Sequence, residues 1–482
     1  MTGCPISDIS VTDFILFLSI HSSVKLGMMK SNPLSNLSDF VSGIRLEELD
    51  PSLVSHARLV LLDTLGAIIA GSCREEISKL LAELPADGNG RVRASCLGRS
   101  EHVSPLTAAM VNGIAGSSLE VEEGNSWAFG HPAIQIVPAL VAECEGRKCS
   151  GRELLAGLIG GYESAVRVSR ASSLRKGLHP TGTWGTVGAA LGVGRVRGRT
   201  GDELCRIANL AASYAISPYV KNSFVGKNVA STFAGVANYF GLLANLFFDC
   251  GIGADESSFQ MTFSRFVSDR FQEEALDEAL GKNYYIATNY FKPYPGCRFA
   301  HSPIDALQAI LQARPLRPEE VKAIRVETFQ AAAHCDTKTP PNPEAVRFSI
   351  PYLFAILILF GNLTVETIER VSVEDPRLQA LAEKVEVKAV VRYEELRPRH
   401  NPTRVTIQLE DGQELAHEVM NALGDPLAPL GEVGLSKKFI SLASPVIGRD
   451  RAEAFWEKSF HLERMEDIGP LIGLLRRKGR MR

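Results

Sequence analysis

Hydrophobic residues in the first part of the chain recur at intervals of three and four positions. Between about residues 34 and 271, Leu, Val and Ile follow this period, and the runs break at Gly, Pro or Asn. The period predicts half-buried helices, and the alternating positions typical of strands are scarce. We therefore expect an all-helical domain. Its predicted helices are Leu46–Ile69, Ser104–Glu120, Ile134–Cys144, Gly151–Ser169, Gly182–Arg195, Gly201–Ala215 and Val229–Phe248.

Alternating apolar and polar positions begin after Lys292. Val321–Phe329 and Val385–Tyr393 show this pattern, which is typical of half-buried strands. Two further predicted strands, Arg404–Leu409 and Glu414–Val419, flank a Glu-Asp-Gly-Gln turn whose Gly accepts a positive φ. Helical periods occur between these strands. The predicted helices of this region are Ser302–Gln312, Ile350–Phe360 and Pro376–Lys384. The sequence thus predicts a mainly α fold with a second, smaller α+β domain.

These patterns divide the chain into four parts. The helical domain covers residues 34–280 and the α+β domain residues 285–425, and residues 430–475 return to the helical domain. Residues 1–33 form a predicted N-terminal extension without an ordered structure. The first 24 residues contain no Lys or Arg, which fits neither a secretory signal nor a transit peptide. We expect a cytoplasmic protein, with a mitochondrial location as the alternative.

Composition and charge narrow the class of protein. The 482 residues carry 52 Lys and Arg against 55 Asp and Glu, so the net charge of −3 gives no reason to expect nucleic acid or an anionic membrane as a partner. The nine cysteines show no Cys-x-x-Cys pair and no Cys/His cluster with zinc-ligand spacing, so we expect reduced thiols. No apolar run reaches the ~20 residues that a membrane-spanning helix needs.

The first candidate for chemistry is an acidic segment that ends in Gly-His-Pro. Glu120, Glu122 and Glu123 lie within twelve residues of His131, and Asn125 lies between them. A carboxylate and an imidazole held together can transfer protons near neutral pH. The alternative is a solvated acidic loop.

Four further segments contain candidate residues. His179 and Lys227 each precede a helix rich in small residues, where free N–H groups attract anions. Lys292 lies between aromatic residues and prolines, which favour partial burial, and Tyr352 opens the most apolar helix. Each also has an ordinary interpretation: a capping histidine, a solvated lysine or a packed tyrosine. Motifs for dinucleotides, phosphate loops and zinc are absent from the sequence.

Taken in order, these segments resemble the MmgE/PrpD family. The resemblance rests on the acidic loop with Gly-His-Pro, Leu-His-Pro, the lysine at 227, Phe-Lys-Pro-Tyr-Pro and Phe-Ser-Ile-Pro-Tyr, and it runs from about Leu34 to Ala443. It implies a helical domain, an α+β lid, a cleft between them, a homodimer, and catalysis without metal or organic cofactor. It also implies a set of site residues. The catalytic residues would be His131, His179, Lys227, Lys292 and Tyr352, and the substrate-binding residues Glu123, Asn125, Lys227 and Lys292.

The family contains 2-methylcitrate dehydratases, cis-aconitate decarboxylases and iminodisuccinate epimerases. Dehydratases and decarboxylases usually have Asp-Asp-Thr-Trp where this chain has Glu122-Glu123-Gly124-Asn125, which places the carboxylate differently and removes a hydroxyl. All three reactions build negative charge beside a substrate carboxylate, which lysines and histidines stabilise. We expect a hydro-lyase that dehydrates 2-methylcitrate or a related alkylcitrate. The alternatives are decarboxylation of a cis-aconitate-like acid, epimerisation of an iminodisuccinate-like acid, and a non-catalytic relative that binds carboxylates.

Overall fold

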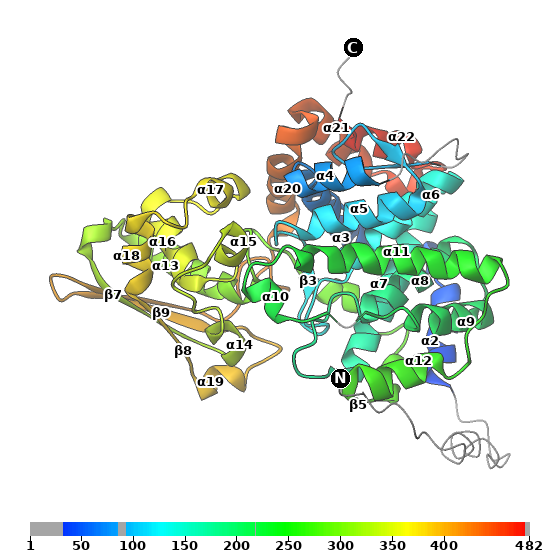
Figure 1. Cartoon of the computed structure of the whole chain (residues 1–482), viewed down its shortest axis with the longest axis horizontal. Coiled ribbons are helices and arrows are strands. Elements are labelled where there is room, and N and C mark those ends of the chain that lie inside the picture. The colour runs from blue at the N-terminus through cyan, green and yellow to red at the C-terminus, as the bar shows by residue number, and fades with distance from the viewer. Residues whose placement is uncertain (1–31, 85–92, 217, 478–482) are drawn as a thin grey trace, which may run out of the picture. The chain divides into compact units, whose positions relative to one another are not determined.

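The structure is a computed structural model that describes residues 32–84, 93–216 and 218–477 (Figure 1). The predicted N-terminal extension, residues 1–33, lies outside the described residues except for its last two. The described chain begins with helix α2, Pro33–Ser42.

The first part of the described chain is helical, as predicted. Its long helices are α3 (Pro51–Gly71), α4 (Glu75–Glu83), α5 (Pro105–Ser117), α6 (Val137–Arg147), α7 (Gly151–Ala171), α8 (Trp184–Val196), α9 (Gly201–Ala212) and α11 (Val229–Asp249), and α10 (Lys221–Phe224) and α12 (Ser258–Met261) are short. Helix α3 begins later than the hydrophobic period predicted, because Asp50 caps the backbone N–H of Ser52 and Pro51 starts the helix. The preceding residues Leu46–Glu48 form a short 3₁₀ turn.

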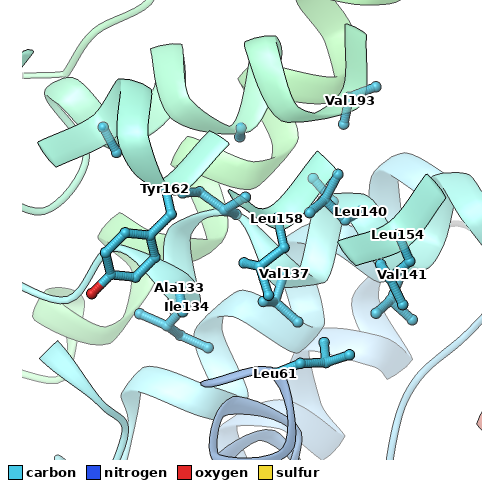
Figure 2. Packing of buried hydrophobic residues seen from close by; sticks show 14 of the residues in the cluster. Leu61, Ala133, Ile134, Val137, Leu140, Val141, Leu154, Leu158, Tyr162 and Val193 are labelled. Atoms are coloured by element: carbon cyan, nitrogen blue, oxygen red, sulfur yellow. The ribbon is translucent and has the colours of Figure 1, made fainter. Parts of the chain in front are cut away.

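Glycines allow helices α7 and α8 to approach closely. A Cβ on Gly161 would lie 2.7 Å from the carbonyl oxygen of Gly188, and a Cβ on Gly157 would lie 2.9 Å from that of Gly192. Side chains larger than hydrogen would therefore separate the two helices. Figure 2 shows the apolar side chains of α6 and α7 that fill the adjoining core.

The later part of the chain forms a four-stranded sheet covered by helices. The strands are β7 (Val321–Thr328), β8 (Val385–Ala389), β9 (Thr403–Leu409) and β10 (Glu414–Val419), in the order β10-β9-β7-β8. Strands β7 and β8 pair parallel, and the other neighbours pair antiparallel. Helices α13 (His301–Ala313), α16 (Ile350–Phe360) and α18 (Pro376–Glu383) lie on one face of the sheet (Figure 1). The short helices of this region are α14 (Gln330–Ala333), α15 (Pro343–Val346), α17 (Val365–Arg370) and α19 (Val391–Glu394).

Strand β8 ends four residues before the predicted boundary. Val390 donates its N–H to the carbonyl of Thr328, and helix α19 then begins. The side chain of Tyr393 packs in a small cluster with Phe329. The buried position that fitted a strand pattern therefore belongs to helix α19. The fold class, a mainly helical part with an additional α+β part, is nevertheless confirmed.

Two hydrophobic clusters contain most of the buried side chains. One cluster joins the N-terminal helices to residues of α20 (Gly431–Ile447), α21 (Arg449–Ser459) and α22 (Gly469–Ile472), and the other lies between the sheet and its helices. Helices α3 and α11 are long and apolar enough to cross a membrane, but α3 packs on α5 and α20, and α11 packs on α5 and α8. The predicted domain boundaries stay a prediction.

A pair of very short strands joins two distant segments that carry candidate residues. Strand β3 (Gly124–Asn125) of the acidic segment pairs antiparallel with β6 (Asn289–Tyr290), just before Lys292. Close by, the N–H of Gly296 donates to the carbonyl of Glu120, 2.8 Å away. This pairing brings the acidic loop and the Phe-Lys-Pro-Tyr-Pro segment together. Two residues per strand show no alternation, so the sequence did not predict it.

Candidate active site

An ion pair between Lys292 and the acidic loop lies at the centre of the site. The Nζ of Lys292 is 3.0 Å from Oε2 of Glu120 and 3.9 Å from Oε2 of Glu122. The side chains of Lys292 and Glu122 are fully buried, whereas Glu120 is partly open to solvent and has a φ of +53°. Burial opposes a charge on Lys292, but Glu120 and Glu122 outweigh it and raise the pKa of the ammonium. Lys292 is therefore a cation at neutral pH.

The two carboxyl groups near Lys292 have different charge states. Burial raises the pKa of Glu120, but the opposing influences of Lys292 and His131 are larger in sum, and its pKa falls below the usual range. Burial of Glu122, with Lys292 opposing, raises its pKa to about 7. The cluster thus holds one firm carboxylate, one ammonium and one carboxyl group that titrates near neutral pH.

Glu120, Glu122 and His131 could also be considered as metal ligands. Each offers one ligand atom, and these atoms lie within 4.8 Å of one another. The ammonium of Lys292, however, lies within 4.0 Å of both carboxylates and already supplies the positive charge that they require. A divalent cation in this group would be repelled by Lys292. The expectation of a site without metal stays a prediction.

His131 presents a nitrogen that can accept a proton. Its Nδ1 lies 2.7 Å from the carbonyl oxygen of Glu123, and because a carbonyl only accepts, Nδ1 carries the hydrogen. Burial, and next the charge of Lys292, lower the pKa of His131 to about 3, so the imidazole is neutral at pH 7. Its Nε2 therefore holds a lone pair and can take up a proton without disturbing the bond to Glu123.

His179 presents the opposite arrangement. The backbone N–H of Thr181 donates to its Nδ1 at 3.0 Å, so Nδ1 is the acceptor and the hydrogen of the neutral ring lies on Nε2. Burial lowers the pKa of His179 to about 4, against the influence of Glu120. Protonation of Nδ1 would place a hydrogen against the N–H of Thr181. His179 is therefore held as a neutral hydrogen-bond donor, and His131 as a proton acceptor.

Both histidines line a cavity of about 130 Å³. A larger cavity of about 410 Å³ lies beside it, with Lys227 in its wall. The two share the residues Glu120, Ser223 and Phe348. The carboxylate of Glu120, which pairs with Lys292, thus lies where the two cavities meet. A ligand bound beside Glu120 would extend into both cavities.

The structure brings together most of the predicted residues. His131, His179 and Asn125 line the smaller cavity, Lys227 lines the larger one, and Lys292 binds Glu120 between them. The side chain of Asn125 is occupied by its loop: it donates to the carbonyl of Tyr285 and accepts from the N–H of Trp127. Lys227 is exposed, and no carboxylate among the described residues forms an ion pair with it.

Two predicted residues occupy other positions. The substrate-binding role of Glu123 does not fit its place, because Oε1 accepts from Ala133 and Oε2 from the hydroxyl of Tyr162, so both oxygens hold the loop. The residue of the acidic segment that reaches the cavities is Glu120. Tyr352 does not join the cluster either: it is buried beside the sheet, and its hydroxyl donates to the carbonyl of Val373 at 2.5 Å. A lid tyrosine in that place would contact the hydrophobic core and not a ligand.

Sequence reasoning placed Glu120 in the acidic candidate segment but gave the substrate-binding role to Glu123, and it assigned no role to Tyr290 or Arg397, which line the smaller cavity. Glu120 belongs to the same acidic run as Glu123, and only its backbone conformation separates the two. Tyr290 explains the glycine of the acidic loop, since a Cβ on Gly124 would lie 2.3 Å from its hydroxyl oxygen. The hydroxyl of Tyr290 thus occupies the place where the side chain of a threonine at position 124 would begin.

We predict that Gly124→Ala destabilises the protein. The added methyl group would also lie 2.9 Å from the carbonyl of Gly130, so strand β6 must shift. Overpacking of this kind costs about 1–3 kcal/mol. Urea unfolding monitored by circular dichroism measures the change. Gly253→Ala is the control, because no atom lies within 4 Å of its added Cβ; equal stability of the two variants would contradict the prediction.

The buried carboxyl of Glu123 predicts a pH dependence of stability. Burial raises its pKa to about 8 in the folded protein, above its ordinary value of 4.5. The folded state then holds a proton that the unfolded state has lost, so this group lowers the free energy of unfolding progressively as pH rises from about 4.5 to 8. In Glu123→Gln this contribution is absent. The melting temperature of the variant should fall less between pH 5 and 8 than that of the wild type, and parallel curves would contradict the assignment.

Comparison with known families defines the class to which this fold and site belong. The MmgE/PrpD N-terminal domain matches residues 35–271, and the MmgE/PrpD C-terminal domain matches residues 294–463. Together these matches cover most of the chain, which therefore belongs to the MmgE/PrpD family.

Curated relatives resemble the chain over nearly its whole length. A cis-aconitate decarboxylase of Aspergillus terreus is 23% identical over 476 residues, which cover 92% of this chain and 96% of that protein. The cis-aconitate decarboxylase of Homo sapiens is 22% identical over 473 residues, covering 93% of this chain and 95% of the relative. A cis-aconitate decarboxylase-like protein of Aspergillus oryzae is 22% identical over 481 residues, covering 92% of this chain and 98% of the relative.

Proposed function

We propose that the protein is a lyase of di- or tricarboxylic acids that removes CO₂ from a cis-aconitate-like substrate. The observation that carries the proposal is the arrangement around Glu120: the ammonium of Lys292, the Nε2 lone pair of His131 and the Nε2–H of His179 belong to one site. The names of the relatives favour decarboxylation among the reactions of this family.

The reaction breaks a carbon–carbon bond and leaves its electron pair on the substrate. That pair delocalises toward a neighbouring carboxyl group, where Lys292 and the N–H of His179 stabilise the growing charge in a poorly hydrated cavity. CO₂ departs as this bond breaks, and the carbon that held it or its allylic position then takes up one proton. Because an anionic substrate raises the pKa of a nearby imidazole, substrate binding allows Nε2 of His131 to carry that proton and deliver it. Solvent restores the proton afterwards.

Dehydration of 2-methylcitrate or an alkylcitrate is the second candidate. Two observations favour it. His131 is neutral in the free protein, which suits a base that removes a proton from carbon. The larger cavity also offers apolar walls from Ile77, Leu80, Ile114 and Val229, which fit an alkyl substituent.

The experiment that separates these functions measures CO₂ release by mass spectrometry, with cis-aconitate and 2-methylcitrate as parallel substrates. The proposal expects CO₂ from cis-aconitate at a rate proportional to protein concentration. Formation of an unsaturated acid from 2-methylcitrate without CO₂ would establish the second candidate. The homodimer implied by the family resemblance stays a prediction.

A further inference from the structure

Arg397 forms no ion pair with a carboxylate of the described residues, a feature that it shares with Lys227 but not with Lys292 or Arg298. It lies in the turn between α19 and β9 and lines the smaller cavity together with His131 and His179. Its guanidinium stacks over the rings of Phe329 and Phe299, 4.3 Å and 5.4 Å from their centres. Within the described residues no carboxylate forms an ion pair with it, and its Nε is buried without a hydrogen-bond partner.

The neighbouring charges are already compensated. Arg298, which lines the same cavity, binds Asp425 at 3.0 Å, and Glu120 binds Lys292 at 3.0 Å. Glu120 is the one carboxylate among the described residues that line this cavity. Both histidines are neutral there, so Arg397 gives the cavity an uncompensated positive charge.

Such a charge is costly to keep without an anion. Burial lowers the pKa of Arg397, which shows that its surroundings disfavour the charged form, although Glu394 opposes this. A guanidinium stacked on two aromatic rings keeps its planar set of N–H groups in a fixed direction, and this fork matches the two oxygens of a carboxylate.

We propose that Arg397 is a specificity-determining residue that binds one carboxylate of the substrate from the side opposite Lys227. The two unpaired cations would then hold separate carboxylates of one acid, one in each cavity, with the reacting carbon beside Glu120 and Lys292 between them. Arg397 would make the site select tricarboxylates over dicarboxylates. This inference rests on the proposed function in one respect, namely that the ligand is a polycarboxylic acid.

The test uses inert ligands, so that it does not depend on turnover. Isothermal titration measures the dissociation constants of tricarballylate, which has three carboxylates, and of glutarate, which lacks the middle one. We expect the wild type to bind tricarballylate at least tenfold more tightly than glutarate. Arg397→Gln should bring this ratio close to one, and Arg397→Lys should leave an intermediate ratio, since it keeps the charge but loses the fork.

Arg399→Gln is the matched control. Arg399 is exposed two residues further along the same turn and lines neither cavity, so this variant should keep the wild-type ratio. An unchanged ratio in Arg397→Gln, or failure of tricarballylate to bind the wild type, would overturn the proposal. If none of the candidate acids is converted while the ratio still depends on Arg397, the lyase function fails and the carboxylate site stands.

A thermal measurement distinguishes ligand binding from a structural role. Since no carboxylate of residues 32–84, 93–216 and 218–477 forms an ion pair with Arg397, Arg397→Gln should leave the melting temperature without ligand unchanged or higher. The rise in melting temperature caused by tricarballylate should shrink relative to the wild type. A variant that melts several degrees lower without ligand, yet keeps the full ligand-induced rise, would show that Arg397 supports the fold and not the substrate.

Discussion

Lys292→Met should lower kcat/KM by about 10²–10³, because it removes the cation that faces the developing negative charge, an effect worth about 3–4 kcal/mol. The ammonium is fully buried, and its nearest carboxylate oxygen is 3.0 Å away. Methionine keeps the length and volume of the side chain but carries no charge. Steady-state kinetics with the converted substrate measures the loss.

The same variant tests whether the protein is an enzyme or a carboxylate-binding relative. If Lys292 acts in the transition state, kcat falls far more than the affinity for tricarballylate. Lys282→Met is the control, since Lys282 is exposed, and it should keep wild-type kinetics. A Lys292→Met protein that keeps its turnover but loses tricarballylate binding would contradict a catalytic role. Circular dichroism checks that the variant is folded, because removal of Lys292 leaves Glu120 and Glu122 close together.

The two histidines should respond differently to substitution by glutamine. His131→Gln should lose about 10²–10⁴ in kcat, because glutamine cannot accept and return a proton at the position of Nε2. His179→Gln should lose much less, since the glutamine amide can still donate an N–H in place of the fixed Nε2–H. Stopped-flow or steady-state rates under saturating substrate measure both.

The prediction is that His131→Gln loses more kcat than His179→Gln. His102→Gln, at an exposed position on β2 (His102–Val103), should behave as the wild type and serves as the control. A larger loss in His179→Gln than in His131→Gln would contradict the roles that the hydrogen bonds assign. Equal, small losses of kcat in the two variants would show that another group transfers the proton.

Local sequence patterns predicted the large elements because hydrophobic periods persist over many residues. Helix α16 has the predicted bounds, Ile350–Phe360, and strand β10 has the predicted bounds, Glu414–Val419. The boundaries that moved did so for local reasons, such as the Asp50 cap on α3 and the early end of β8. In each case a single hydrogen bond or packing contact, and not the period of the hydrophobic residues, determined where the element begins or ends.

The site was less predictable, because its arrangement depends on contacts between distant segments. The sequence identified His131, His179, Lys227 and Lys292 as candidates. In the structure the first three line two adjoining cavities, and the buried Lys292 pairs with Glu120, which lines both. The sequence could not separate Glu120 from Glu123, since both are acidic residues of one loop and differ only in where the backbone turns. Arg397 lies in an irregular turn without a pattern, and only the three-dimensional structure shows that it lines the cavity without an ion pair to a described carboxylate.

The most direct test of the central claim is an NMR experiment in D₂O with purified protein and four acids: cis-aconitate, 2-methylcitrate, citrate and iminodisuccinate. We predict that cis-aconitate loses CO₂ and that the product carries one deuterium on the carbon that held the lost carboxyl group or at its allylic position, because proton delivery follows bond cleavage. Loss of water from 2-methylcitrate would show that the protein is a dehydratase, the second candidate function. Four unchanged spectra at high protein concentration would contradict the proposal that this site is a lyase of di- or tricarboxylic acids.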